Sequence, residues 1–297
     1  MLALVLACFA AGLLIQRLVP RSRSLVPWLD HAVLSVTVPA LVLDKLPELA
    51  VGADLATPVA AAWGTGALAA GVVLLAGRHF AWKRSTVGAL MLVTPLGNTT
   101  FLGLAMVESL LGEEELTRAI AFDQLGSFLG LAVYGSFIAA HYGSSEGGVG
   151  PVALRLLRFP PFIAVLASIP LRWVELPAGA EDVLGALGSL VAPIAMLTLG
   201  LRFRVVATAS ARQAAIWCLG TKMVLMPLAV VVAALAAGGW DDPAWRASIL
   251  ESAMPPMVTA GVLAAGADLD GDLATTVVGV GLLAALVTIP VLALILG

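Results

Sequence analysis

The sequence predicts an all-α membrane protein of about ten transmembrane helices, in two inverted five-helix repeats whose broken helices 4 and 9 cross each other. Hydrophobic residues make up 60% of the 297 residues and charged residues only 12%, and the mean hydropathy is +1.02. Because soluble domains are about 45–50% apolar and about 25% charged, this composition excludes a soluble enzyme and a disordered chain. With 16 Lys and Arg against 19 Asp and Glu, the chain has no basic excess that would favour nucleic acid.

Ten apolar stretches, each near the roughly 20 residues that a span requires, are separated by short polar joints. The first is expected to be a retained span, because Arg17, Arg21 and Arg23 follow it instead of preceding it as in a signal peptide. The predicted domains are a first repeat (1–142), a short Gly/Ser-rich linker (143–150) and a second repeat (151–297). The predicted spans cover residues 2–19, 28–46, 54–77, 85–110, 117–140, 152–171, 183–200, 211–236, 246–266 and 273–296.

The basic residues predict the orientation, because Lys and Arg collect on the cytoplasmic side. The joints after spans 2, 4, 6 and 8 hold four, namely Lys45, Arg118, Arg172 and Arg246. The joints after spans 1, 3, 5 and 7 hold eleven basic residues, namely Arg17, Arg21, Arg23, Arg78, Lys83, Arg84, Arg155, Arg158, Arg202, Arg204 and Arg212. We therefore expect these joints to be cytoplasmic, in a multi-pass protein of the inner or plasma membrane with both termini outside the cytoplasm.

Two pairs of motifs recur five spans apart. Residues 35–39 (SVTVP) in span 2 match residues 189–193 (SLVAP) in span 7, and the break at 94–100 (TPLGNTT) in span 4 matches that at 251–259 (ESAMPPMVT) in span 9. Because five is odd, the second copy would enter the membrane from the opposite side, as in many secondary transporters. The alternative is chance, since Pro and Gly are common in membrane helices.

Spans 4 and 9 cannot be continuous helices. Pro95, and the pair Pro255 and Pro256, lack the N–H donor and obstruct the preceding turn. Unwound backbone at membrane depth is tolerated only where protein or water satisfies it, so both breaks should face an internal cavity and cross. The half-helix that starts at each break carries partial positive charge, and two such ends favour an anion. The alternative is two kinked helices that only pack together.

These motifs resemble the auxin efflux carrier family of permeases. The matching stretches are residues 33–43 (VLSVTVPALVL), 96–104 (LGNTTFLGL), 159–161 (FPP), 192–200 (APIAMLTLG), 222–227 (KMVLMP) and 253–256 (AMPP). The resemblance implies inverted five-helix repeats, crossed helices at the proline breaks and elevator-like transport of organic anions. A more distant likeness to the bile acid:sodium symporters implies that polar residues at the breaks, here Asn98 and Glu251, bind sodium.

Three ionisable side chains lie deep in predicted spans: Asp123 in span 5, Lys222 in span 8 and Glu251 in span 9. An ionised group at the bilayer centre costs roughly 2.5–3.5 kcal/mol unless it is paired or hydrated. The functional interpretation is that Glu251 and Asp123 bind a coupling cation, either Na⁺ through hard oxygen ligands or H⁺ through a desolvated carboxylate. The structural alternative is an ion pair of Lys222 with either acid.

The predicted function is secondary active transport of a small organic anion, a carboxylate, by an elevator-like mechanism coupled to Na⁺ or H⁺. The alternatives are a sodium-coupled symporter of amphipathic anions and a passive anion channel. The sequence has no nucleophile–base set that would indicate an enzyme, and it has no cluster of metal-binding residues. The expected partners are membrane lipid and the transported anion. A homodimer is compatible with the chain. The candidate residues are Pro95, Gly97, Asn98, Thr99, Pro255, Pro256, Ser35 and Pro39 for substrate, Glu251, Asp123, Gln124 and Asn98 for the coupling ion, with Glu251 and Asp123 as the candidate Na⁺ ligands, and Lys222 for a charge pair.

Overall fold

The computed structural model describes residues 2–19, 21–45, 47, 55–143, 160–174, 177, 179–203 and 208–296. Nearly all of these residues are helical, and the extended pairing found in this part of the chain is an isolated antiparallel bridge between Gly97 and Pro256. The predicted linker at 143–150, apart from its first residue, and Phe159 lie outside the described residues. The all-α prediction is confirmed for the described part of the chain.

The helices follow the predicted spans closely, usually within a few residues at each end. Several spans consist of an α-helix joined to a π-helical segment, in which a widened turn leaves carbonyl groups without their usual partner. The π-helical segments are Val33–Thr37, Thr99–Gly103, Phe122–Phe128, Leu131–Gly135 and Thr221–Leu225. The α-helices are α1 (Leu2–Leu18), α2 (Val26–Ala32), α3 (Val38–Lys45), α4 (Ala56–His79), α5 (Arg84–Val93), α6 (Leu104–Leu111), α7 (Leu116–Ala121), α8 (Ser136–Tyr142), α10 (Pro160–Leu171), α11 (Ala180–Ser189), α12 (Val191–Arg202), α13 (Ala209–Gly220), α14 (Met226–Ala236), α15 (Pro243–Ser252), α16 (Val258–Gly266) and α17 (Gly271–Leu296).

Among the described residues, six helical segments are long and apolar enough to cross a membrane: Val26–Asp44, Ala56–His79, Leu116–Tyr142, Ala180–Arg202, Ala209–Ala236 and Gly271–Leu296. Three shorter apolar helices, Ala7–Leu18, Arg84–Val93 and Pro160–Leu171, fall in other predicted spans. The multi-pass membrane class is therefore supported, whereas the count of ten spans and the inverted repeat stay predictions.

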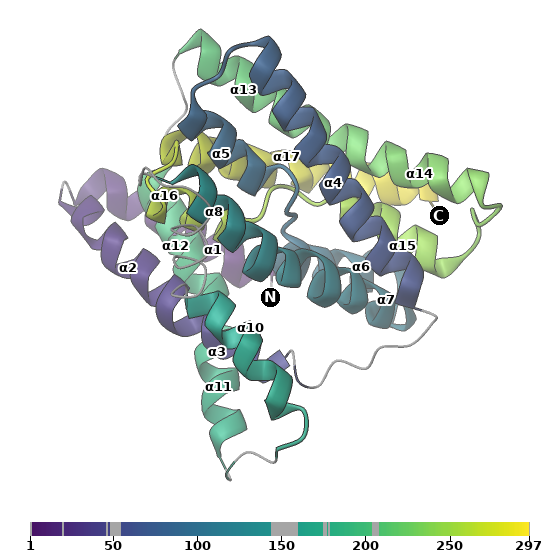
Figure 1. Cartoon of the computed structure of the whole chain (residues 1–297), viewed down its shortest axis with the longest axis horizontal. Helices are drawn as coiled ribbons and strands as arrows, with labels where there is room; N and C mark the ends of the chain where they lie inside the picture. The colour runs from purple at the N-terminus through teal and green to yellow at the C-terminus, as the bar shows by residue number, and fades with distance from the viewer. Residues whose placement is uncertain are drawn as a thin grey trace.

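The helices pack as two groups. In the first group, α1 packs on α12, and α3 packs on α10 and α11. The second group contains α4 to α8 and α13 to α17, with α15 on α4 and α14 and with α16 on α5 and α17. Figure 1 shows α2, α3, α10 and α11 on one side of the molecule and α4, α13, α14 and α15 on the other. The groups touch where α16 meets α2 and α12 and where α17 meets α12, so α16 and α17 lie at their contact.

Two glycines bring α1 and α12 into direct backbone contact within the first group. A methyl group placed on Gly12 would lie 2.8 Å from the Cα of Gly200, and one placed on Gly200 would lie 2.8 Å from the Cα of Gly12. Small residues at such a crossing let two membrane helices approach closely enough for extensive van der Waals contact. The α1–α12 contact therefore depends on the absence of a side chain at both positions.

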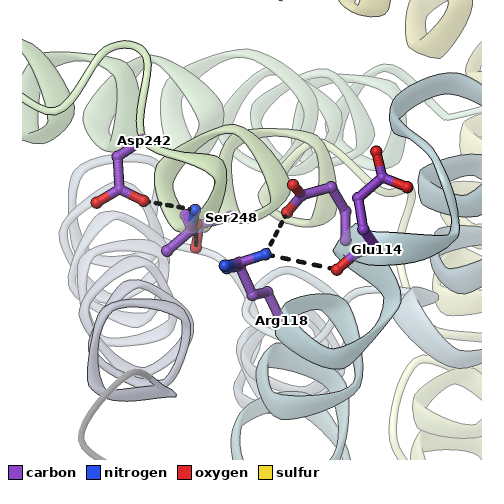
Figure 2. A network of polar contacts seen from close by, with 6 residues as sticks. Glu114, Arg118, Asp242 and Ser248 are labelled. Atoms are coloured by element: carbon purple, nitrogen blue, oxygen red, sulfur yellow. Dashed lines mark hydrogen bonds and ion pairs between the residues drawn. The ribbon is translucent and has the colours of Figure 1, made fainter.

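Polar side chains stabilise the first turn of α15 and, separately, the start of the neighbouring α7 (Figure 2). The Asp242 carboxylate accepts a hydrogen bond of 2.8 Å from the Ala244 N–H and so caps the first turn of α15. On the neighbouring α7, the Arg118 guanidinium forms an ion pair of 3.1 Å with Glu115 and donates to the Glu114 carbonyl oxygen. The Asp242 cap fixes where α15 begins, and α15 leads directly to the second helix break.

Candidate functional site

The two helix breaks cross each other and are joined through their backbones. The Asn98 N–H donates to the Pro255 carbonyl at 2.8 Å, and the Met257 N–H donates to the Leu96 carbonyl at 2.9 Å. Each half-helix leading to the crossing, α5 and α15, has ten residues, which is about 15 Å, or half the roughly 30 Å thickness of the hydrocarbon core. The predicted breaks are thus present, and the lengths of α5 and α15 are those expected for a crossing near mid-depth.

Pro95 and Pro256 each remove one backbone donor, and a side chain from another helix replaces it in both cases. The Met91 carbonyl would normally accept from residue 95, but Pro95 has no N–H, and the Tyr134 hydroxyl donates to it at 2.8 Å. In the second break, Pro256 leaves the Ser252 carbonyl without its helical donor, and the Lys222 ammonium donates to it at 3.0 Å. Both breaks are therefore stabilised by a donor from outside the broken helix, neutral in one case and charged in the other.

Asp123 is buried beside the first break, and both oxygens of its carboxylate accept hydrogen bonds. Its Oδ1 accepts hydrogen bonds from the hydroxyls of Thr99 at 2.5 Å and Thr100 at 2.7 Å, and its Oδ2 accepts from the Gln124 amide at 2.7 Å. Thr99 and Thr100 begin the π-helical segment that follows the first break. Asp123 therefore ties this segment to the helix that follows α7.

Glu251 has the opposite environment. Its side chain is fully buried, and neither carboxylate oxygen has a hydrogen-bond partner. The carboxylate packs against Gly103, where any side chain would overlap it, and it interacts electrostatically with Asp123 and Lys222. A buried acidic group without donors is costly, which makes Glu251 a natural position for a bound positive charge.

The ion pair of Lys222 that was the structural alternative is not found among the described residues. Lys222 is 1% exposed, and no Asp or Glu oxygen of the described residues lies within the 4.0 Å that defines an ion pair with its Nζ. Its ammonium instead bridges the breaks, because it bonds to the Ser252 carbonyl and lies 3.0 Å from the position of a methyl group placed on Gly97. The prediction missed this because sequence spacing does not reveal a backbone carbonyl freed by a proline.

A small cavity of about 10 Å³ lies where the crossing meets the first helix group. Val38 and Val191 line it from the first group, and Asn98, Thr100 and Thr259 line it from the second. The Nδ2 of Asn98 is buried and has no hydrogen-bond partner. Since one water needs roughly 10–15 Å³, this cavity holds a single water at most and is closed to any larger ligand in this structure.

A larger cavity of about 200 Å³ lies on another face of the crossing, entirely among helices of the second group. Its wall is mainly apolar and includes Pro95, Phe122 and Met226, while Lys222 and Tyr134 contribute polar atoms. The predicted substrate residues therefore do not share one cavity, because Pro95 lines this cavity while Asn98 lines the small one.

The comparisons with known proteins identify the family. A family model described as membrane transport protein matches residues 1–146 and 149–293. The chain belongs to this auxin efflux carrier-like membrane transport family. An uncharacterized transporter of Methanothermobacter thermautotrophicus is 28% identical over 273 residues, which cover 90% of this chain and 88% of that protein. An uncharacterized transporter of Methanocaldococcus jannaschii is 34% identical over 133 residues, or 43% of this chain and 42% of that protein.

Most of the residues that were predicted to bind substrate lie at or beside the crossing. Gly97 and Pro256 form the bridge, Asn98 and Pro255 are hydrogen-bonded, and Thr99 binds Asp123. The other two do not join them: the Ser35 hydroxyl lies 3.3 Å from Nδ1 of His31 on its own helix, and neither Ser35 nor Pro39 lines either cavity.

Residues that contact the site and were not among the predicted site residues include Thr100, Gly103, Tyr134 and Ser252. Gly103 lies within the LGNTTFLGL stretch, and its spacing from Asn98 was the one local signal that could have suggested a close approach. Tyr134 and Ser252 act through backbone contacts over long sequence separations, as donor to Met91 and acceptor from Lys222.

The oxygen groups around the crossing fit a bound Na⁺ poorly. Hard cations require several oxygen ligands at once. The Asp123 carboxylate already accepts three hydrogen bonds, and the Ser252 carbonyl is taken by Lys222. Glu251 has free oxygens, and the described residues contain no group of three His, Cys, Asp or Glu side chains that could hold a metal ion.

Proposed function

We propose that this protein is a secondary active transporter that moves a small organic anion by an elevator-like alternation and uses an ion gradient through Glu251. The observation that carries the proposal is the crossing of two interrupted helices at the contact between two helix groups. The segments starting at Thr99 and Val258 have first-turn N–H groups without helical acceptors, which favour an anion. The unpartnered Asn98 amide supplies a further donor.

The closed cavity beside Asn98 supports alternating access. The first group contributes one wall of this cavity and the second group contributes the other, so a sliding motion of one group along the other would open and close it. Because the crossing belongs entirely to the second group, such a motion would carry the anion-binding N–H groups with it. H⁺ is the favoured coupling ion, because the oxygen groups around the crossing fit Na⁺ poorly, and Na⁺ is the alternative that the flux experiment tests.

The deciding experiment is flux into proteoliposomes. The purified protein is reconstituted, and uptake of a panel of carboxylates is measured with an imposed Na⁺ gradient, an imposed H⁺ gradient, or neither. Accumulation against a concentration gradient with one of the ions supports the proposal. Passive equilibration of every substrate, independent of both gradients, would identify a channel instead.

We predict that Asn98→Ala weakens binding of the transported carboxylate. The variant removes the amide donor to a charged group, so the loss should be about 1.5–3 kcal/mol. Binding is measured on purified protein by calorimetry. Ser248→Ala is a matched control, because Ser248 is also buried and donates a hydrogen bond to Ala244, but it lines neither cavity. Equal affinity in wild type and Asn98→Ala would remove Asn98 from the site.

We also propose that both termini lie outside the cytoplasm, from the distribution of basic residues. The test adds a cysteine after Gly297 in a background in which Cys8 and Cys218 are replaced by Ala. An impermeant thiol reagent should label this cysteine in intact cells, whereas a Gly147→Cys variant in the joint after span 5 should be labelled only after lysis. The reverse pattern would invert the topology.

A further inference from the structure

The carbonyl that is freed by a proline accepts from a different kind of donor at each break. Pro95 frees the Met91 carbonyl, which receives a neutral hydroxyl donor from Tyr134. Pro256 frees the Ser252 carbonyl, which receives a charged ammonium donor from Lys222. The first break shows that a neutral donor is sufficient to satisfy such a carbonyl. The full charge buried at the second break therefore serves something besides capping.

The surroundings of the Lys222 ammonium are those of a cation site. Ser252 is the last residue of α15, where the free carbonyls of a helix carry partial negative charge. Glu251, one residue earlier, has a buried carboxylate with two unpartnered oxygens and interacts electrostatically with Lys222. The ammonium thus lies at a helix carboxyl end, close to a bare carboxylate, and touches both breaks through Ser252 and Gly97.

We propose that the Lys222 ammonium is a tethered cation that fills the position a coupling Na⁺ would need at the crossing, so that the protein works without Na⁺. The Lys222 ammonium donates to the Ser252 carbonyl and places a positive charge near Glu251 without an ion pair, and a soluble ion would have to displace a covalently attached group. The inference rests on the proposed function only for its consequence in transport, because the position of the charge is a property of the folded protein itself.

Thermal unfolding of the purified protein in detergent tests this directly, without a substrate. Melting temperatures are compared in matched chloride salts of sodium, methylammonium and choline, the last being too large for the position. Wild type should melt at the same temperature in all three. Lys222→Ala vacates the position, and sodium or methylammonium should then raise the melting temperature by about 2 °C or more over choline, because a ligand that binds only the folded state stabilises it.

Two further variants control the comparison. Lys222→Met fills the vacated volume with an apolar chain and should show no salt dependence. Lys83→Ala, which removes an exposed lysine outside the site, should behave as wild type. If Lys222→Ala does not fold, Lys222→Ser replaces it in the experiment. Lys222→Ser also vacates the position, so sodium or methylammonium should raise its melting temperature in the same way. A sodium-dependent rise in wild type, or the absence of any cation response in the variants with the vacated position, would overturn the inference.

Transport gives a second readout. Carboxylate uptake by wild type should be equal in sodium and choline, and Lys222→Ala should lose at least roughly tenfold of its rate in choline and recover part of it with sodium or methylammonium. If wild type moves none of the carboxylates, the proposed function fails while the unfolding experiment still decides the role of Lys222. Equal uptake by Lys222→Ala and wild type in choline would contradict the inference alone.

Discussion

Replacing Glu251 by Gln should abolish gradient-driven accumulation of substrate while it leaves substrate exchange measurable. Glu251 is fully buried, and its two carboxylate oxygens have no hydrogen-bond partner. Gln keeps the size of the side chain and removes its charge, so the contact with Gly103 should remain. The expected loss is complete for accumulation, because the group that binds the driving charge is gone.

The physical reason lies in the cost of moving charge through the bilayer. An uncompensated carboxylate near mid-depth costs several kcal/mol, which hinders any motion that changes its surroundings. When Glu251 takes up the coupling proton, this cost falls and the second helix group can move. In Glu251→Gln the side chain is always neutral, so the motion no longer depends on the gradient.

The measurement is uptake and exchange of the same carboxylate in proteoliposomes, with and without an imposed ion gradient. Glu108→Gln is the matched control, because Glu108 is exposed on α6 and should leave both activities unchanged. Asp123→Asn should have a smaller effect on coupling than Glu251→Gln, since Asp123 is already held by Thr99, Thr100 and Gln124. Wild-type accumulation by Glu251→Gln would make Glu251 a packing residue.

The variant Gly200→Val should greatly reduce the yield and thermal stability of the folded protein. A side chain at Gly200 would meet the backbone of α1, with the Leu13 nitrogen 2.9 Å from its Cβ. Overpacking a core typically costs 1–3 kcal/mol where side chains can adjust. Here the neighbours are backbone atoms, so α1 and α12 would have to separate, and we expect a loss at the top of that range or beyond.

A second glycine separates this steric effect from a general effect of glycine replacement. Gly71 lies in the middle of α4, and a Cβ added there would have no neighbour within 4 Å. Gly71→Ala should therefore be neutral or stabilising by about 0.5–1 kcal/mol, because alanine favours the helix. Melting curves of the two variants and of Gly12→Ala would show the contrast. A Gly200→Val protein as stable as wild type would mean that α1 and α12 do not pack this closely.

The helix breaks could be predicted from the sequence because proline acts locally. Pro95, Pro255 and Pro256 remove their own hydrogen-bond donors wherever they occur, and the segments around them are interrupted as expected. The membrane class followed from composition, which is likewise independent of the tertiary structure. Predictions of this kind need only the chemistry of one residue and its immediate neighbours.

The donors that satisfy the freed carbonyls could not be predicted in the same way. Tyr134 reaches Met91 from 43 positions away, and Lys222 reaches Ser252 from 30. No short-range rule links these pairs, because packing of separate helices brings them together. The two buried acids could be identified as possible partners of Lys222 from the sequence, whereas the contact of its ammonium with the Ser252 carbonyl depends on the packing of separate helices.

Because main-chain hydrogen bonds hold the crossing, the side chains around it are free to change during evolution. The bonds from Asn98 N–H to the Pro255 carbonyl and from Met257 N–H to the Leu96 carbonyl require no particular side chain at their donor or acceptor positions. Mutations of the side chains around the crossing can therefore alter which cargo is accepted while the architecture survives. New specificities can arise by single substitutions, without an intermediate in evolution that has lost its fold.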